Sequence, residues 1–216
     1  PFPPTWMNWM MYIMLIVSIV ACIFRLYIFF FSISAAILFH IAHAYYFSFE
    51  KIDHGFATFG YVAMLMPFLA NDYQKARLSK QGECRGWSLW LMQSAIAFSY
   101  FLSGLEKIWT GRFIWFSEHH LSAYLAAANT DMAKMLLQYP PLVQSISIFI
   151  ISFQLTFPMV LFYRRATWFY LLRGAFFHLQ TKFIMNIGAW LSPWIWAYVC
   201  FIFPLLFEKK YATRSF

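Results

Sequence analysis

Polar residues on one face of a predicted membrane-spanning helix are the first candidates for chemistry in this sequence. Gly174, His178, Lys182 and Asn186 are spaced four apart, and residues at that spacing share a helix face. Ionisable groups inside a membrane face the bundle interior and often mark a ligand or proton path. For His178 both a functional role and a structural hydrogen-bond network stay open. For Lys182 the favoured interpretation is a side chain that reaches toward the outer interface.

A second polar stripe ends at a lysine. Ala95, Ser99, Ser103 and Lys107 are again four residues apart, and Gly104 adjoins them. Small residues at this spacing let another helix approach closely, so we expect Lys107 to face protein rather than lipid. A desolvated lysine can lose its proton near neutral pH and act as a base, and we expect burial to lower its pKa. The alternative is an anchor at the end of a span.

Histidines elsewhere could bind a metal or haem. His40 and His43 are three residues apart in another apolar segment, and with His178 they make axial haem ligation conceivable. Helix packing is the simpler explanation, so haem is not expected. The run EHH at 118–120 is more typical of a solvated interfacial segment than of a metal site. We therefore predict no metal ligands.

The composition shows which elements must position these residues. Of the 216 residues, 62% are hydrophobic and 11% charged, whereas soluble domains contain about 25% charged residues. This excludes a soluble enzyme, and the many aromatic residues exclude a disordered chain. Continuous rather than alternating apolar runs argue against a transmembrane barrel. The sequence predicts an all-α, polytopic helical bundle in the membrane, formed by one domain over residues 1–216 without a soluble domain.

The apolar runs predict about seven membrane-spanning helices. A break is required near Arg25, because an unbroken helix there would be roughly twice as long as the membrane core is thick. The segment 117–139 has helical periodicity and is expected along the membrane interface. The chain shows neither an initiator Met nor a signal-peptide pattern, so we expect it to begin inside a longer protein, with an upstream span missing. The expected spans are 6–24, 28–47, 56–70, 87–105, 142–163, 167–186 and 190–207.

The net charge of +8 is interpreted as a topology signal rather than as a nucleic-acid interface, because the basic residues lie mostly in loops. One set of span ends holds ten Lys and Arg residues and the opposite set holds four. The positive-inside rule places the richer set, including the loop 71–86 and the C-terminal tail, in the cytoplasm. The end of the fourth span and the turn at 48–55 then face the periplasmic or lumenal side. The ten are Arg25, Lys75, Arg77, Lys80, Arg85, Arg164, Arg165, Lys209, Lys210 and Arg214, and the four are Lys51, Lys107, Arg112 and Lys134.

Several segments resemble a known membrane family. YFLSGLEKIWTGRFIW, FQLTFPMVLFYRRATW and GAFFHLQTKFIMNIGAWLSPWIWAYVCFIFP are similar, in order and spacing, to the HTTM domain. This domain is shared by vitamin K-dependent gamma-glutamyl carboxylases and many bacterial relatives. KIDHGFATFGYVAMLMPFLAND also resembles a carboxylase stretch, so the resemblance covers about residues 50–207.

The resemblance implies a set of site residues. Lys107 matches the carboxylase lysine that deprotonates vitamin K hydroquinone, and His54 and His178 match histidines of that family. These three are the candidate catalytic residues, with Asp53 and Lys182 as candidate substrate-binding residues. The implied site faces the outer side of the membrane, which agrees with the orientation predicted from the charges.

Two functions remain open. Asp53 stands where the carboxylases have Asn, Glu106 replaces a basic residue, and the large lumenal domain is absent from this sequence, so carboxylation of protein glutamates is not implied. The favoured interpretation is a membrane subunit or scaffold of a larger complex that binds a quinone, a lipid or another hydrophobic ligand. The alternative is an enzyme that uses Lys107 as a base on a lipid-phase quinol. The expected partners are the lipid bilayer and other membrane subunits, not nucleic acid.

Overall fold

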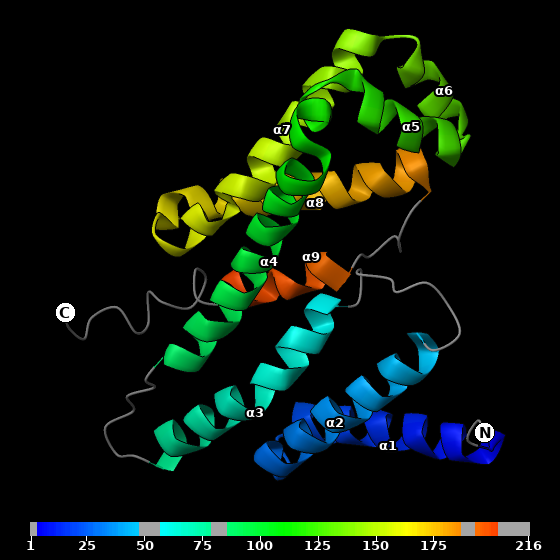
Figure 1. Ribbon diagram of the computed structural model, residues 1–216. Helices are drawn as coiled ribbons and strands as arrows, with labels where there is room; N and C mark the ends of the chain where they lie inside the picture. Colours follow the sequence, from blue (N-terminus) through cyan, green and yellow to red (C-terminus); the bar gives the residue numbers. More distant parts are fainter. Residues whose placement is uncertain (1–3, 48–56, 79–85, 187–192, 203–216) are drawn as a thin grey trace. The chain divides into compact units, whose positions relative to one another are not determined.

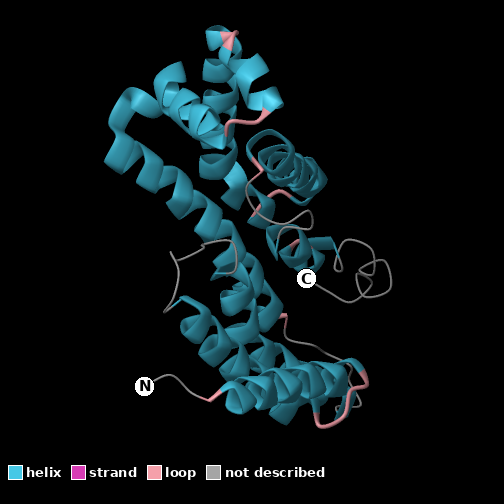
Figure 2. Ribbon diagram, turned by 90° about the vertical axis from the view of Figure 1, so that its right-hand side faces the viewer, coloured by secondary structure: helices cyan, strands magenta, loops and turns pink. Residues whose placement is uncertain are grey.

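The described secondary structure is helical throughout. A computed structural model describes residues 4–47, 57–78, 86–186 and 193–202, and within these ranges it contains helices and turns but no strand (Figures 1 and 2). The predicted all-α class is therefore confirmed. The helices form two compact units, Pro1–Met92 and Gln93–Phe216, which are described separately below.

The first unit is built on a hairpin of two apolar helices. Helices α1 (Thr5–Ile23) and α2 (Ile28–Phe47) pack on each other, and α3 (Ala57–Leu78) packs on α2. The break predicted near Arg25 is confirmed. Arg25 and Tyr27 have φ angles of 58° and 38°, so two left-handed residues reverse the chain without Gly or Pro.

Helix α3 is longer than the sequence pattern predicted. The expected span ended at residue 70, but the helix continues to Leu78 through the polar stretch NDYQKARL, so the prediction of a loop beginning at residue 71 is wrong. Tertiary contacts explain the extension. Asp72 is only 8% exposed, and the Arg25 guanidinium lies 5.6 Å from the centre of the Tyr73 ring. Residues 79–85, the remainder of the predicted loop apart from Gly86, lie outside the described residues.

The second unit begins within α4 (Trp87–Gly111), and short turns connect several of its helices. The segment 117–139 is helical, as its periodicity predicted, and forms two helices. Asn129 ends the first in a left-handed conformation (φ 51°), and the Thr130 side chain accepts a hydrogen bond from the Ala133 amide at the start of the second. A 3-10 turn at Arg112–Phe116 follows α4, and another at Phe157–Leu161 follows α7. The helices are α4 (Trp87–Gly111), α5 (Glu118–Ala128), α6 (Asp131–Leu137), α7 (Pro140–Thr156), α8 (Arg164–Met185) and α9 (Pro193–Ala197).

Within the described ranges, three helical stretches are long and apolar enough to cross a membrane: Thr5–Ile23, Ile28–Tyr45 and Pro140–Leu161. Each coincides with a predicted span to within a few residues, and their length and composition are compatible with a membrane protein. Helices α4 and α8 correspond to two further predicted spans but carry more polar residues. A total of seven spans stays a prediction, and residues 203–216, which include the predicted cytoplasmic tail, lie outside the described part of the chain.

Candidate functional site

Lys107 lies in the last turns of α4, beyond the end of the predicted span, and its amine is held by nearby groups. Its Nζ donates to the Ser103 hydroxyl at 2.9 Å and the Ser103 carbonyl at 3.2 Å, and it lies 5.5 Å from the centre of the Trp115 ring. Burial lowers the pKa of the Lys107 amine from its usual value, and the neighbouring Glu106 carboxylate acts in the opposite direction. The direction matches the sequence-based expectation.

Gly104, which adjoins the small-residue stripe below Lys107, faces another helix. A Cβ added at Gly104 would lie 3.0 Å from Cβ of Gln154 and 3.2 Å from the backbone nitrogen of Leu155, both on α7. Only a glycine lets the two helices approach this closely. Gln154 is itself 4% exposed, and its Oε1 atom has no hydrogen-bond donor among the described residues. Within this part of the chain, an unpaired amide acceptor therefore lies opposite Gly104, three residues before Lys107.

His178 lies in a different cluster of the same unit. Its Nε2 atom is 2.7 Å from the Tyr100 hydroxyl, which is in turn 2.6 Å from the Tyr198 hydroxyl. The imidazole also stacks on Trp194, with ring centres 6.1 Å apart and planes 12° apart. The prediction that His178 contacts protein is therefore confirmed. Three polar side chains, from α4, from α8 and from the turn directly after α9, satisfy one another.

Gly174 makes this cluster possible. A Cβ at Gly174 would lie 1.9 Å from the Tyr198 hydroxyl and 3.1 Å from the Phe153 ring. The polar stripe of α8 therefore includes a glycine because an aromatic side chain fills the space above it. Thus Gly174 and His178 of the predicted stripe contact the same group of aromatic residues.

The structure does not bring Lys107 and His178 into contact. Tyr100, which contacts His178, is seven residues before Lys107 on α4, a separation of about 10 Å along the helix axis. Lys182 is half-buried in the last turn of α8, where its carbonyl accepts the Asn186 amide. Asp53 and His54 lie outside the described residues, so their predicted convergence with Lys107 stays a prediction.

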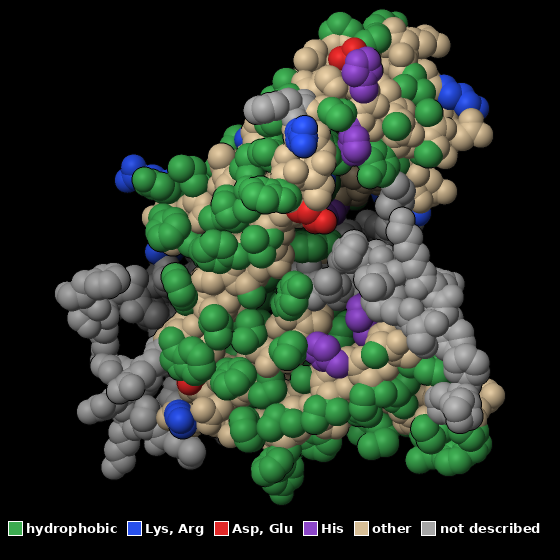
Figure 3. Space-filling view, viewed as in Figure 1, with side chains coloured by type: hydrophobic (Ala, Val, Ile, Leu, Met, Phe, Trp, Pro, Cys, Tyr) green, Lys and Arg blue, Asp and Glu red, His purple; other side chains and the backbone are tan. Residues whose placement is uncertain are grey.

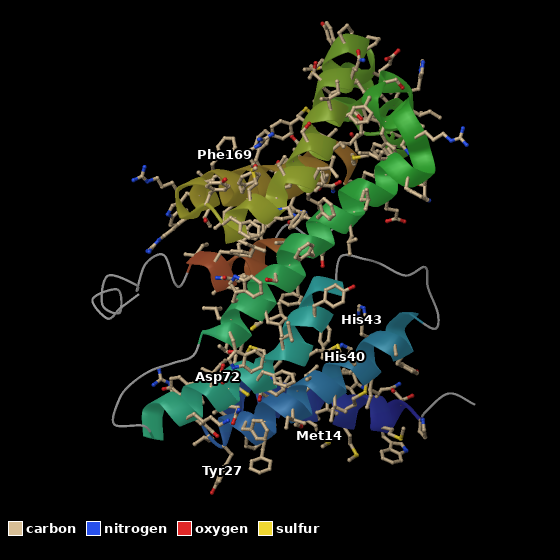
Figure 4. The ribbon with its side chains drawn as sticks, turned by 60° about the vertical axis from the view of Figure 1, so that its left-hand side comes forward. Met14, Tyr27, His40, His43, Asp72 and Phe169 are labelled. Carbon is tan, nitrogen blue, oxygen red and sulfur yellow. The ribbon has the colours of Figure 1, made fainter. Side chains whose placement is uncertain are left out.

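The histidines of α2 have local partners. His40 Nδ1 is 2.7 Å from the Ala36 carbonyl, and the His43 ring stacks on Phe39 at 5.5 Å. Both side chains project from α2 in Figure 4. Within the described ranges, no group of three His, Cys, Asp or Glu side chains is close enough to hold a metal ion.

Two pockets differ in the ligands that they could accept. A pocket of about 20 Å³, lined in part by Leu121, Leu125 and Ile184, has room for about one water molecule. A pocket of about 230 Å³ lies between α1 and α2. It is mostly apolar, and its two polar groups are joined by a 3.0 Å hydrogen bond from the Asn8 amide to the Tyr45 hydroxyl. Neither pocket is lined by Lys107 or His178.

Three residues of these sites were not predicted from the sequence: Tyr100, Tyr198 and Gln154. Gln154 has Ser152 and Thr156 two residues to either side, so no signal in the sequence distinguishes it. Tyr100 and Tyr198 carry no signal either, since tyrosine is frequent throughout this chain. Their role depends on being adjacent in space.

The chain was also compared with known proteins. No protein-family model matches it, and no curated protein or solved structure is significantly similar to it.

Proposed function

We propose that this chain is a membrane subunit or scaffold of a larger complex, of the type that the HTTM-like segments suggest. One observation carries the proposal. The apolar side chains of α1 are exposed around most of the helix, including Trp9, Ile13, Ile16 and Ile23. Monomeric soluble proteins rarely leave continuous apolar surfaces of this kind uncovered, so lipid or other membrane helices must cover this one. Hydrophobic side chains are also spread over the face seen in Figure 3.

The pocket between α1 and α2 supports a hydrophobic ligand as part of this function. Met7, Met11 and Ile41 supply apolar walls, and the polar groups of Asn8 and Tyr45 bond to each other. Such a lining suits an acyl chain or the ring of a quinone. The ligand of the proposed subunit is therefore a lipid or quinone-like molecule.

Isolation from the native membrane tests the subunit proposal. The tagged chain, extracted in a mild detergent, should elute as a complex with other membrane proteins in fixed stoichiometry. Organic extraction of that complex, followed by mass spectrometry, should release a lipid or quinone in proportion to the chain. Elution of the chain alone, in every detergent that keeps it folded, would contradict the proposal.

The second candidate function is an enzyme that uses Lys107 as a base. Burial lowers the pKa of its half-buried amine, and this direction favours the alternative because a general base must be able to release its proton. Lys107→Met keeps the volume and removes the base, so an enzyme should lose turnover of a lipid-soluble quinol by about 100-fold or more. Lys134→Met is the matched control, because Lys134 is exposed on α6 beside Asp131. Equal turnover of both variants and the unaltered chain contradicts catalysis by Lys107.

The orientation of the chain can be tested separately through Cys84. In a Cys22→Ala, Cys200→Ala background, Cys84 is the single thiol of the chain. The excess of Lys and Arg around it places it in the cytoplasm. A thiol reagent that cannot cross membranes should therefore label it only after the cells are opened. Labelling of intact cells would reverse the orientation and the side on which Lys107 lies.

A further inference from the structure

Helix α8 carries a cation whose charge is unpaired within the described part of the chain. Arg173 lies near the middle of α8, nine residues after its first residue, Arg164. No hydrogen bond or ion pair to Arg173 is found among the described residues, and its Nε atom is buried without an acceptor. The close acid–base side-chain pairs found in these residues, Glu118 with His119 and Asp131 with Lys134, lie on α5 and α6 instead.

Aromatic rings hold the guanidinium in place. Its central carbon is 4.1 Å from the ring centre of Phe149, 5.0 Å from that of Phe169 and 5.9 Å from that of Phe153. Contacts of this kind attract a cation to the face of a ring. They offset only part of the cost of removing the charge from water, and they leave all of the N–H donors of the group available.

Arginine differs from histidine and lysine in how it responds to burial. A buried histidine or lysine can become neutral by losing its proton, but a guanidinium stays charged in proteins. A charge kept inside a membrane-spanning helix pairs with an opposite charge or lines an aqueous cavity. Arg173 therefore requires an anionic group from outside the described residues if α8 spans the membrane as predicted.

The surface beside Arg173 is suited to a second helix. Phe169, Leu172 and Phe176 are 56%, 67% and 60% exposed and follow one another at a spacing that puts them on one face of α8. Phe169 is labelled in Figure 4. A partner helix packed on this apolar face would bring its own side chains next to the guanidinium.

We propose that this face of α8 binds a membrane helix of a partner subunit, and that a carboxylate of that helix pairs with Arg173. The partner is defined by its chemistry: an apolar membrane-spanning helix with one Asp or Glu near its middle. A carboxylate matches the planar guanidinium through two parallel hydrogen bonds. Arg173 is placed about 14 Å from the start of α8 by the helix rise of 1.5 Å per residue, so an acidic residue deep in the partner helix fits better than a lipid headgroup at the membrane surface. This inference rests on the proposed function as a membrane subunit.

The experiment uses the full chain in phosphatidylcholine vesicles and a synthetic polyleucine helix of membrane-spanning length with one central Glu. A polyleucine helix without Glu is the control peptide. Energy transfer between labelled chain and labelled peptide measures their association. The chain should bind the Glu peptide at least about tenfold more tightly than the Leu peptide, because separating a buried charge pair is costly.

Three variants locate the effect. Arg173→Leu should remove the preference for the Glu peptide, and Arg173→Lys should retain part of it because the charge remains. Arg165→Leu, which removes a cation from the first turn of the same helix, should leave the preference unchanged. Thermal unfolding verifies that each variant folds.

Several outcomes would overturn the inference. Equal binding of both peptides to the unaltered chain would do so even if Arg173→Leu failed to fold. Retention of the preference in Arg173→Leu would also do so. Loss of the preference when phosphatidylglycerol is added to the vesicles would assign Arg173 to a lipid headgroup instead. If the chain assembles with native subunits but binds both peptides equally, only this inference is disproved. If it prefers the Glu peptide but elutes from the native membrane without other subunits, only the proposed function is disproved.

Discussion

Apolar helices pack in different ways in two regions of the molecule. One region is the hairpin of α1 and α2, and the other is the aromatic cluster around Tyr100. In the apolar stretch of α1, 11% of the residues are buried, compared with 44% in the candidate span that begins at Pro140. Both stretches are apolar enough to cross a membrane. Similar apolarity therefore does not indicate how much of a helix is covered by its own chain.

The contacts inside the two regions also differ. The hairpin is joined by small polar side chains, such as the Ser18 and Ser34 hydroxyls at 3.0 Å. The cluster is joined by large rings in close contact, such as Tyr100 and Phe157 with ring centres 4.3 Å apart. A region held by rings in fixed positions should tolerate added volume far less than one held by small groups. Local hydrogen exchange, measured separately for residues 5–45 and 140–185, can test this difference.

The largest expected difference comes from matched glycine substitutions. Gly174→Ala adds a methyl group that overlaps the Tyr198 hydroxyl. The substitution should therefore reduce the stability of the cluster by about 3 kcal/mol. In the hairpin unit, a Cβ at Gly60 would lie 3.4 Å from His40 Nε2, an ordinary contact. Gly60→Ala should therefore be neutral, or slightly stabilising because alanine favours helix. Equal losses in both variants would mean that the two regions are equally tight.

A smaller difference is expected from removing one hydroxyl group. Tyr100→Phe leaves His178 and Tyr198 without their shared partner and should cost about 2 kcal/mol, because buried polar groups are then unpaired. Tyr45→Phe removes the acceptor of the Asn8 amide in a more exposed place and should cost less than about 1 kcal/mol. Both values are obtained from denaturant unfolding in detergent micelles. A Tyr100→Phe chain as stable as the unaltered one would show that the His178 hydrogen bond is dispensable.

The smallest difference is expected between two buried serines. Ser147 donates to the Trp115 carbonyl and is fully buried, so Ser147→Ala should cost about 1 kcal/mol. Ser18 also bonds to the Met14 carbonyl within its own helix, so Ser18→Ala should cost about 0.6 kcal/mol, the average for hydrogen bonds between membrane helices. Exchange rates of the flanking amides measure both losses. A larger loss in Ser18→Ala would reverse the order of the two regions.

The sequence predicted much of the fold because a continuous apolar run identifies a helix without reference to the segments that pack on it. The bounds of α2 agree with the predicted 28–47, and those of α1 differ from 6–24 by one residue at each end. The helical continuation of α3 to Leu78 was missed. Its polar residues resemble a loop when each is considered alone, whereas in the structure Asp72 is buried and Tyr73 lies beside Arg25.

For the candidate site, the sequence by itself determined which residues are unusual in their surroundings. His178 belongs to a polar stripe and Lys107 ends a small-residue stripe, and spacing along a helix is a local property. Only the tertiary structure decided which groups they meet. Tyr100 and Tyr198 are 98 residues apart in the chain, and their hydroxyls meet at Gly174 because that residue has no side chain. Such a contact depends on how helices pack, and packing is set by the shapes of several segments together rather than by the pattern of any one of them.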